Sequence, residues 1–280
     1  MSKWKYLSGV LLTGLLLLGA ASKVEGITLP LGFSDTAVTD VASPTALAFT
    51  PDGRLLIAEK PGRLWVYQNG ALSPTPALDL TGRICTERER GLLGVAVDPG
   101  FAATGHVYLY YTAGSAGSCV NRVSRFVLSE GNVLSDEFVL VDNMPSPSPF
   151  HNAGDLHFGK DGFLYISVGD GGCDYAGPTR CADLNDATRD PHVLVGKVLR
   201  ITSTGEIPLG NPFLGPDSAR CNVSGQTAPG NKCQEIFAFG LRNPFRMAFD
   251  PNAVGTRFYI NDVGGSTWEE VDLGQAGADY

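Results

Sequence analysis

His151 and Asp170 are the residues whose types and spacing most clearly suggest chemistry. They lie close to the two ends of the stretch HNAGDLHFGKDGFLYISVGDGG, which covers residues 151–172. A carboxylate that holds an imidazole fixes its tautomer and raises its basicity, which suits the ring to act as a general base. The alternative is that His151 is an ordinary loop residue and that Asp170, which precedes two glycines, only forms a turn.

The residues between this pair predict a β-hairpin. Apolar residues alternate with polar ones over residues 156–158 and again over 164–168, which is the period of a β-strand. Between these two runs, residues 159–162 read Gly-Lys-Asp-Gly, a short turn-forming sequence. The sequence therefore predicts two antiparallel strands joined by a tight turn.

Antiparallel pairing across this turn sets the register of the hairpin. It places Phe158 beside Phe163, and the same count continued along the ladder places His151 opposite Asp170. A bulge of one or two residues would not separate the two side chains far. We therefore expect the imidazole and the carboxylate to meet at the open end of the hairpin.

The same phrase of strand, turn and strand recurs along the chain. Each copy has apolar runs on both sides of a turn rich in Asp, Gly or Pro, and the copies lie at 45–57, 91–110, 156–168 and 246–260. Further strand-like segments lie at 64–67, 122–126 and 197–201. A hairpin with additional strands makes a blade of about four strands, so we expect an all-β propeller. The alternative is a β-sandwich in which similar hairpins recur by coincidence.

The composition agrees with an all-β domain and bounds the partners. The chain has 280 residues, of which 43 % are hydrophobic, with 35 Gly and 18 Pro. These counts favour many short strands joined by turns. The formal net charge of -8 argues against nucleic acid as a partner.

Residues 1–26 have the pattern of a secretory signal peptide. Lys3 and Lys5 precede an apolar run over 7–18, and small residues follow over 19–22. A membrane anchor is the alternative, although the run is short for a membrane span of about 20 residues. We therefore expect an exported protein, periplasmic or extracellular, with no stable membrane insertion after the signal is cleaved.

The six cysteines all follow the predicted signal. An even number of cysteines in an exported chain predicts disulfides. Short spacing favours two local pairs and leaves a third, namely Cys173–Cys181, Cys221–Cys233 and Cys85–Cys119. The connectivity stays open at this point, because six cysteines allow 15 pairings.

Four motifs, taken in order, carry a family resemblance. They are ERGLLGVAVDPGF at 89–101, the stretch at 151–172, FGLRNPFRMAFDP at 239–251, and NDVGGSTWEEVDL at 261–273. Together they resemble the soluble pyrroloquinoline quinone (PQQ)-dependent sugar dehydrogenases, the glucose/sorbosone and aldose sugar dehydrogenase family. That family also includes secreted propellers that are similar to the hedgehog-interacting protein.

The resemblance implies a six-bladed β-propeller of four-stranded antiparallel blades. Residues 27–280 would form its N-terminal portion, roughly the first four blades, because the chain ends at Tyr280 inside the fourth repeat. The resemblance places cofactor-clamping basic residues in the remaining blades. We therefore expect that this chain alone would not hold the cofactor.

The resemblance also implies roles for individual residues. His151 matches the general base that takes a proton from the sugar C1 hydroxyl, and Asp170 matches the carboxylate that orients it. Arg242 and Asn243 match a pair that lies over the quinone, where Arg242 would stabilise negative charge on the quinone oxygen. Glu89 falls where glucose dehydrogenases place a Gln close to the quinone.

A calcium site is implied in the last motif. Gly264 and Gly265 match backbone carbonyls that hold calcium, and Glu269 falls at a nearby acidic position. Calcium prefers hard oxygen ligands, and as a Lewis acid it would polarise the quinone carbonyl. The expected cofactors are thus PQQ and calcium, the substrate an aldose oxidised at C1 to a lactone, and the oxidant of the reduced cofactor an external electron acceptor.

Two departures from the enzyme pattern support an alternative. Residues 153–155 read Ala-Gly-Asp where the glucose dehydrogenases have Gly-Gly-Arg, and Glu89 replaces a neutral amide. Both departures resemble the hedgehog-interacting subgroup. The alternative function is a secreted, non-catalytic propeller that binds a protein or glycan partner.

Overall fold

The structure, a computed structural model, describes residues 29–115, 117–172 and 187–280. The chain divides into two units, residues 1–38 and 39–280. The described part of the first unit is exposed and contains only a turn, and the predicted signal peptide lies outside the described residues. None of the described helices is long and apolar enough to cross a membrane. All that follows concerns the second unit.

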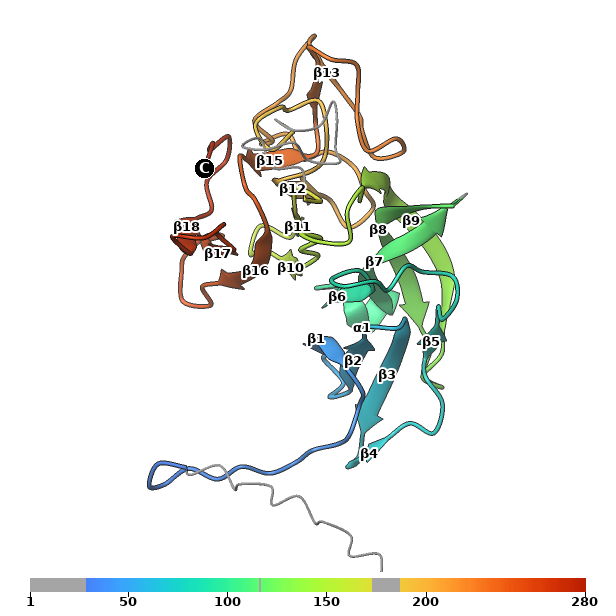
Figure 1. Cartoon of the computed structure of the whole chain (residues 1–280). Coiled ribbons are helices and arrows are strands. Elements are labelled where there is room, and N and C mark those ends of the chain that lie inside the picture. The colour runs from blue at the N-terminus through green and yellow to red at the C-terminus, as the bar shows by residue number, and fades with distance from the viewer. Residues whose placement is uncertain (1–28, 116, 173–186) are drawn as a thin grey trace, which may run out of the picture. The chain divides into compact units, whose positions relative to one another are not determined.

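Four antiparallel sheets follow one another along the second unit (Figure 1). The first sheet contains β1 (Pro44–Phe49), β2 (Leu55–Glu59), β3 (Arg63–Gln68), β4 (Ala71–Leu72) and β5 (Leu78–Asp79). The second contains β6 (Leu92–Val97), β7 (His106–Ser115), β8 (Ser118–Leu128) and β9 (Leu134–Pro145). The third contains β10 (Leu156–Phe158), β11 (Leu164–Val168), β12 (Lys197–Ile201) and β15 (Ile236–Phe239). The fourth contains β16 (Pro244–Phe249), β17 (Phe258–Asp262) and β18 (Glu270–Leu273).

Two smaller features complete the described elements. The short helix α1 (Phe101–Thr104) joins β6 to β7. In the insertion between β12 and β15, β13 (Ser218–Ala219) pairs in parallel with β14 (Lys232–Cys233). Each recurring phrase of the sequence opens one of the four sheets, so the expected all-β blades are confirmed. The six-blade count stays a prediction.

The register of the central hairpin differs from the prediction by one residue. Phe158 pairs with Leu164, not with Phe163. The turn holds one extra residue, because Gly162 adopts a left-handed φ of 78° and the Gly159 N–H bonds to the Phe163 carbonyl at 2.9 Å. A glycine in this conformation is typical of a bulged hairpin turn.

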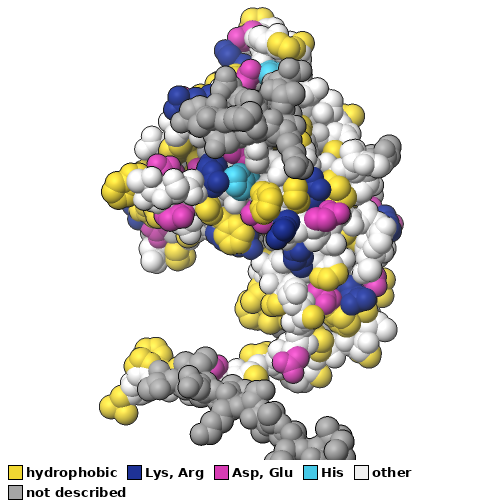
Figure 2. Space-filling view, viewed as in Figure 1, with side chains coloured by type: hydrophobic (Ala, Val, Ile, Leu, Met, Phe, Trp, Pro, Cys, Tyr) yellow, Lys and Arg dark blue, Asp and Glu magenta, His cyan; other side chains and the backbone are white. Residues whose placement is uncertain are grey.

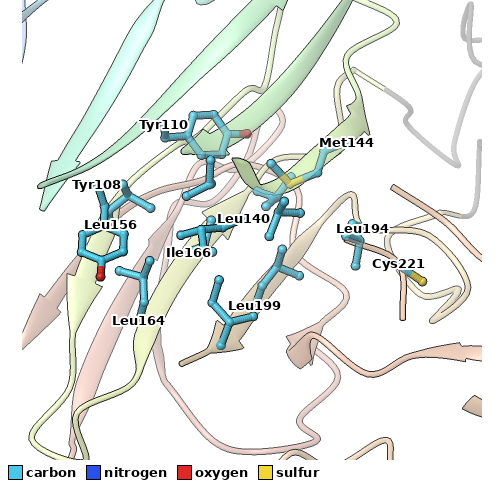
Figure 3. Close-up of a cluster of buried hydrophobic side chains, with 14 of the residues drawn as sticks. Tyr108, Tyr110, Leu140, Met144, Leu156, Leu164, Ile166, Leu194, Leu199 and Cys221 are labelled. Atoms are coloured by element: carbon cyan, nitrogen blue, oxygen red, sulfur yellow. The ribbon is translucent and has the colours of Figure 1, made fainter. Parts of the chain in front are cut away.

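The strand β11 is buried on both faces and thereby joins three sheets. Leu164 and Ile166 pack with side chains of the second sheet, among them Tyr108 and Tyr110 of β7 (Figure 3). The next residue, Tyr165, points to the opposite face and packs with the fourth sheet. This alternation places apolar layers between successive sheets, which is how blades of a propeller stack.

Two of the three expected disulfides are present. Cys85 is bonded to Cys119, and Cys221 to Cys233. The first links the loop before β6 to β8, and the second closes a loop within the insertion, because Cys233 lies in β14 and Cys221 follows β13. The expected pair Cys173–Cys181 lies outside the described residues.

Candidate active site

The predicted contact between His151 and Asp170 is present. Nδ1 of the imidazole lies 2.8 Å from Oδ1 of the carboxylate. Asp170 is only 1 % exposed, whereas the His151 side chain is 16 % exposed. A carboxylate on Nδ1 favours the tautomer with a proton there, which leaves Nε2 as the nitrogen that can accept one.

Backbone bonds fix Asp170 from two directions. Its Oδ1 accepts the Gly172 N–H at 2.6 Å, and its own N–H donates to the Arg242 carbonyl at 2.8 Å. Asp170 belongs to the loop after β11, and Arg242 to the turn between β15 and β16. The third and fourth sheets therefore meet at the pair.

The Arg242 side chain binds the turn that follows β17. Its Nη1 donates to the carbonyls of Val263 and Gly264, each at 2.8 Å. Asn243, the next residue, is 4 % exposed, and its Oδ1 accepts the Ala153 N–H at 3.2 Å. These two residues thus face different neighbours, Arg242 the last motif and Asn243 the His151 segment.

Glu89 lies beside His151 but contacts its backbone. The carboxylate Oε2 accepts the His151 N–H at 2.6 Å, and the Glu89 N–H donates to the Pro149 carbonyl at 3.0 Å. Glu89 is therefore bonded, through both its side chain and its backbone, to the segment that carries the imidazole.

Sequence reasoning missed Asp262, which supports Arg242 through its backbone. Its Oδ2 accepts the Arg242 N–H at 2.8 Å and its Oδ1 accepts the Asn243 N–H at 2.6 Å. Burial raises the pKa of this carboxyl to about 6, and the two backbone bonds oppose that shift. The signal was available, because Asp262 pairs with Pro244 at the open end of the hairpin β16–β17.

A cavity of about 400 Å³ opens next to Arg242. Its lining includes a second guanidinium, from Arg189, the indole of Trp268, and the turn with Gly264 and Gly265. Guanidinium groups pair with carboxylates, and an indole can stack on a planar ring. The lining also contains two carboxylates, so it is the part around Arg189 and Trp268 that would suit a flat anionic molecule such as PQQ.

A second cavity, of about 270 Å³, is lined by Glu89 and by part of the His151 segment. It is lined by residues from the first, second and fourth sheets and from the His151 segment, among them Lys60, Leu93, Ala153 and Arg246. Figure 2 shows basic, acidic and apolar side chains close together on one face of the molecule. The lining of the second cavity is likewise of mixed charge, because it contains Glu89 as well as Lys60 and Arg246.

The expected calcium ligands do not form a calcium site as they stand. The Gly264 carbonyl already accepts from Arg242, and the Gly264 N–H donates to Glu269 Oε2 at 3.0 Å. A guanidinium on that carbonyl would repel a cation, and both Gly265 and Glu269 are exposed. Calcium takes six to eight oxygen ligands, and a set of that kind is not formed by the described residues of this turn.

Comparison with known families identifies the resemblance independently. The family profile described as glucose/sorbosone dehydrogenase matches residues 41–280. The aldose sugar dehydrogenase YliI of Escherichia coli K12 is 31 % identical over 243 residues, which cover 85 % of this chain and 58 % of that protein. The hedgehog-interacting protein of Mus musculus is 29 % identical over 81 % of this chain and 34 % of its own length.

Solved structures agree with the sequence comparison. A glucose dehydrogenase-type oxidoreductase from Thermus thermophilus superposes with a TM-score of 0.71 at 32 % identity, covering 87 % of this chain and 64 % of that one. The PQQ-bound aldose sugar dehydrogenase of Streptomyces coelicolor gives 0.69 at 28 % identity, covering 88 % and 64 %. The chain spans between about a third and three fifths of the length of these curated relatives.

Proposed function

The chain belongs to the glucose/sorbosone dehydrogenase family, and from this premise we propose that the protein oxidises aldose sugars at C1 to lactones. The observation that carries the proposal is the bond of 2.8 Å between His151 Nδ1 and Asp170 Oδ1, next to the Arg242 backbone. We further propose an exported enzyme, periplasmic or extracellular, that passes its electrons to an external acceptor.

His151 is the proposed base in this reaction. Its Nε2 accepts the proton of the C1 hydroxyl as the C1–H bond gives up a hydride and the C1–O bond becomes a carbonyl. Asp170 holds Nδ1–H and stabilises the imidazolium that forms. Because Asp170 is buried and fixed by backbone bonds, the ring stays oriented during the proton transfer.

Bound PQQ would supply the acceptor for that hydride. Arg242 and Arg189 line the cavity where its carboxylates would pair, and Trp268 offers a stacking surface. We propose that Arg242 also stabilises negative charge that develops there. Asn243 and Glu89, which the family resemblance places at the cofactor, both bond the His151 segment. Calcium at Gly264, Gly265 and Glu269 would need Arg242 to leave the Gly264 carbonyl, and the proposed residue roles do not require it.

The test is replacement of His151 in the protein at its full natural length, loaded with PQQ. We expect His151→Ala to lower kcat/KM for aldoses by about 10²- to 10⁴-fold, the usual contribution of a general base, in a dye-reduction assay. His157→Ala is the matched control, because His157 also pairs with a carboxylate, Asp155, at 3.1 Å. Full activity of His151→Ala would remove the base assignment.

A non-catalytic propeller is the second candidate. It is favoured by the likeness to the hedgehog-interacting protein and by the bond that occupies the Gly264 carbonyl. This candidate predicts no uptake of PQQ by the full-length protein in absorbance titrations, with or without calcium. Saturable uptake would exclude it.

A further inference from the structure

The backbone that carries His151 has a conformation that most residues avoid. His151 has a φ of 55° and Ala153 a φ of 49°. Both lie in the left-handed region, which is unfavourable for a residue with a Cβ atom. Such a segment persists only when its surroundings hold it in place, and held segments of this kind cluster at functional sites.

Side chains from three places hold the segment at three successive residues. Glu89 Oε2, before β6, accepts the His151 N–H at 2.6 Å. The Tyr110 hydroxyl, from β7, donates to the Asn152 carbonyl at 3.0 Å. Asn243 Oδ1, before β16, accepts the Ala153 N–H at 3.2 Å.

The Asn152 side chain anchors the middle of the segment inside the protein. It is fully buried, and its Oδ1 accepts bonds from Ser146 Oγ at 2.8 Å and Asn121 Nδ2 at 3.2 Å. Because Asn152 is anchored inside the protein, movement of its two neighbours is restricted. The bonds to Glu89 and Asn243, together with the bond from the Gly171 N–H to the His151 carbonyl at 3.1 Å, then hold the direction of the His151 Cα–Cβ bond.

We propose that Glu89 and Asn243 are positioning residues for His151. They hold the left-handed conformations of His151 and Ala153 and so aim the imidazole at Asp170, which is itself fixed by the Gly172 N–H and the Arg242 carbonyl. If the backbone relaxes to a negative φ, the ring turns away and the bond between Nδ1 and Oδ1 breaks. The predicted change in the orientation of the His151 ring does not depend on the proposed function. Only the predicted change in reaction rate rests on that function.

The role requires an acceptor oxygen and not a negative charge. A Gln at position 89 still offers an oxygen to the His151 N–H, and an Asp at position 243 still offers one to the Ala153 N–H. Alanine at either position removes the acceptor. Conservative and alanine variants therefore separate a positioning role from a direct electrostatic contact with a cofactor.

The first experiment uses the chain without cofactor. ¹⁵N NMR of the imidazole, at a pH where the ring is neutral, reports which nitrogen carries the proton, and amide exchange reports the His151 N–H bond. We expect Nδ1–H in the wild type and in Glu89→Gln. In Glu89→Ala we expect a shift toward Nε2–H and faster exchange of the His151 amide, by about tenfold or more, the factor that corresponds to a loss of about 1.4 kcal/mol.

Controls keep the result interpretable. Glu87→Ala removes an exposed carboxylate on the same loop, whose ion pair goes to Arg90 at 3.6 Å, and should leave the imidazole unchanged. If Glu89→Ala does not fold, Asn243→Ala against Asn243→Asp tests the same claim. Wild-type tautomer and exchange in a folded alanine variant would overturn the proposal, and so would loss of the tautomer in Glu89→Gln.

The second experiment measures rate in the full-length, PQQ-loaded protein. We expect Glu89→Ala to lower kcat by about 10²-fold, as misplacement by about 1 Å can, with little change in the KM for sugar. Glu89→Gln should keep kcat close to the wild-type value. If His151→Ala proves fully active, the proposed function fails while the NMR result still decides the positioning role.

Discussion

Asp262 shows how a single carboxylate shapes the residues around it. It is 6 % exposed and accepts both the Arg242 and the Asn243 N–H. The turn between β15 and β16 thus places Arg242 at the cavity of about 400 Å³ and Asn243 at the His151 segment. A residue outside the predicted site therefore supports two residues within it.

The raised pKa of Asp262 predicts a pH dependence of stability. With a pKa of about 6 in the folded chain and 3.8 as the ordinary value, the folded state binds this proton more tightly than the unfolded state. The contribution is therefore complete below about pH 4 and is lost as the pH rises through 6, by up to about 3 kcal/mol.

Asp262→Asn removes this titration and isolates its effect. Urea unfolding of both proteins at about pH 4.5 and about pH 7, on either side of the raised pKa, should show the advantage of the wild type over the variant shrinking as the pH rises. Parallel pH profiles for the two proteins would contradict the raised pKa.

At the residue scale, the sequence predicted contacts within one hairpin and missed those between sheets. His151 and Asp170 could be placed together because a short turn fixes which residues of the two strands meet. The bond of Glu89 to the His151 N–H joins two sheets, and strand periodicity does not determine how sheets dock. From the sequence, Glu89 was therefore only a departure from the enzyme pattern, in which a carboxylate replaces a neutral amide, whereas in the structure this carboxylate binds a backbone N–H.

At the scale of elements, the two strands that open each sheet were predictable from their apolar residues, whereas several later strands were not. β9 was missed because residues 135–139 are exposed and carry adjacent acidic residues in place of an alternating pattern. β18 was missed as a strand for the same reason, since three of its four residues are exposed. The one-residue register error came from Gly162, whose φ no periodicity reveals.

Gly162 also carries a prediction about the turn. A Cβ there would meet no atom within 4 Å, so its φ of 78° is the sole source of strain on substitution. We expect Gly162→Ala to lower the free energy of unfolding by about 1 kcal/mol, measured by denaturant unfolding. Gly255→Ala is the matched control, in equally open space without a positive φ. Equal stability of the two variants would argue against the left-handed turn.

Lys197 is buried, although the alternation of apolar and polar residues in its strand does not predict this. It lies at the start of β12 with 0 % exposure, and its Nζ donates to the carbonyls of Ala187, Thr188 and Val195 at 2.6 to 2.7 Å. Burial lowers the pKa of Lys197 to about 7, while three carbonyl acceptors favour the ammonium form. The bonds from Lys197 to residues 187 and 188 hold the segment that places Arg189 at the cavity of about 400 Å³.

At the scale of the whole molecule, aromatic packing holds the third and fourth sheets together. The ring of Tyr165 packs edge-on against Phe237, Phe249 and Phe258, with centroids 5.0 to 5.4 Å apart. Two of these partners, Phe249 and Phe258, belong to the fourth sheet. The packing between the third and fourth sheets therefore supports the bond between the Asp170 N–H and the Arg242 carbonyl.

Truncation of Tyr165 should weaken this interface. We expect Tyr165→Leu to lower the free energy of unfolding by about 2 to 3 kcal/mol and to speed amide exchange in β16 and β17. Tyr259→Leu is the matched control, because Tyr259 also lies in the fourth sheet but is 41 % exposed. Similar losses for both variants would mean that the interface is not held by the buried ring.

The bond from the Asp170 N–H to the Arg242 carbonyl has a consequence for how the protein fails on heating. Since this bond joins the loop after β11 to the turn that leads into the fourth sheet, Asp170 keeps this anchor only while the two sheets remain docked. We therefore expect the contact between His151 and Asp170 to loosen when these sheets begin to separate, at a temperature below that of global unfolding. The NMR resonance of the His151 imidazole, followed as the temperature rises, would report this early step.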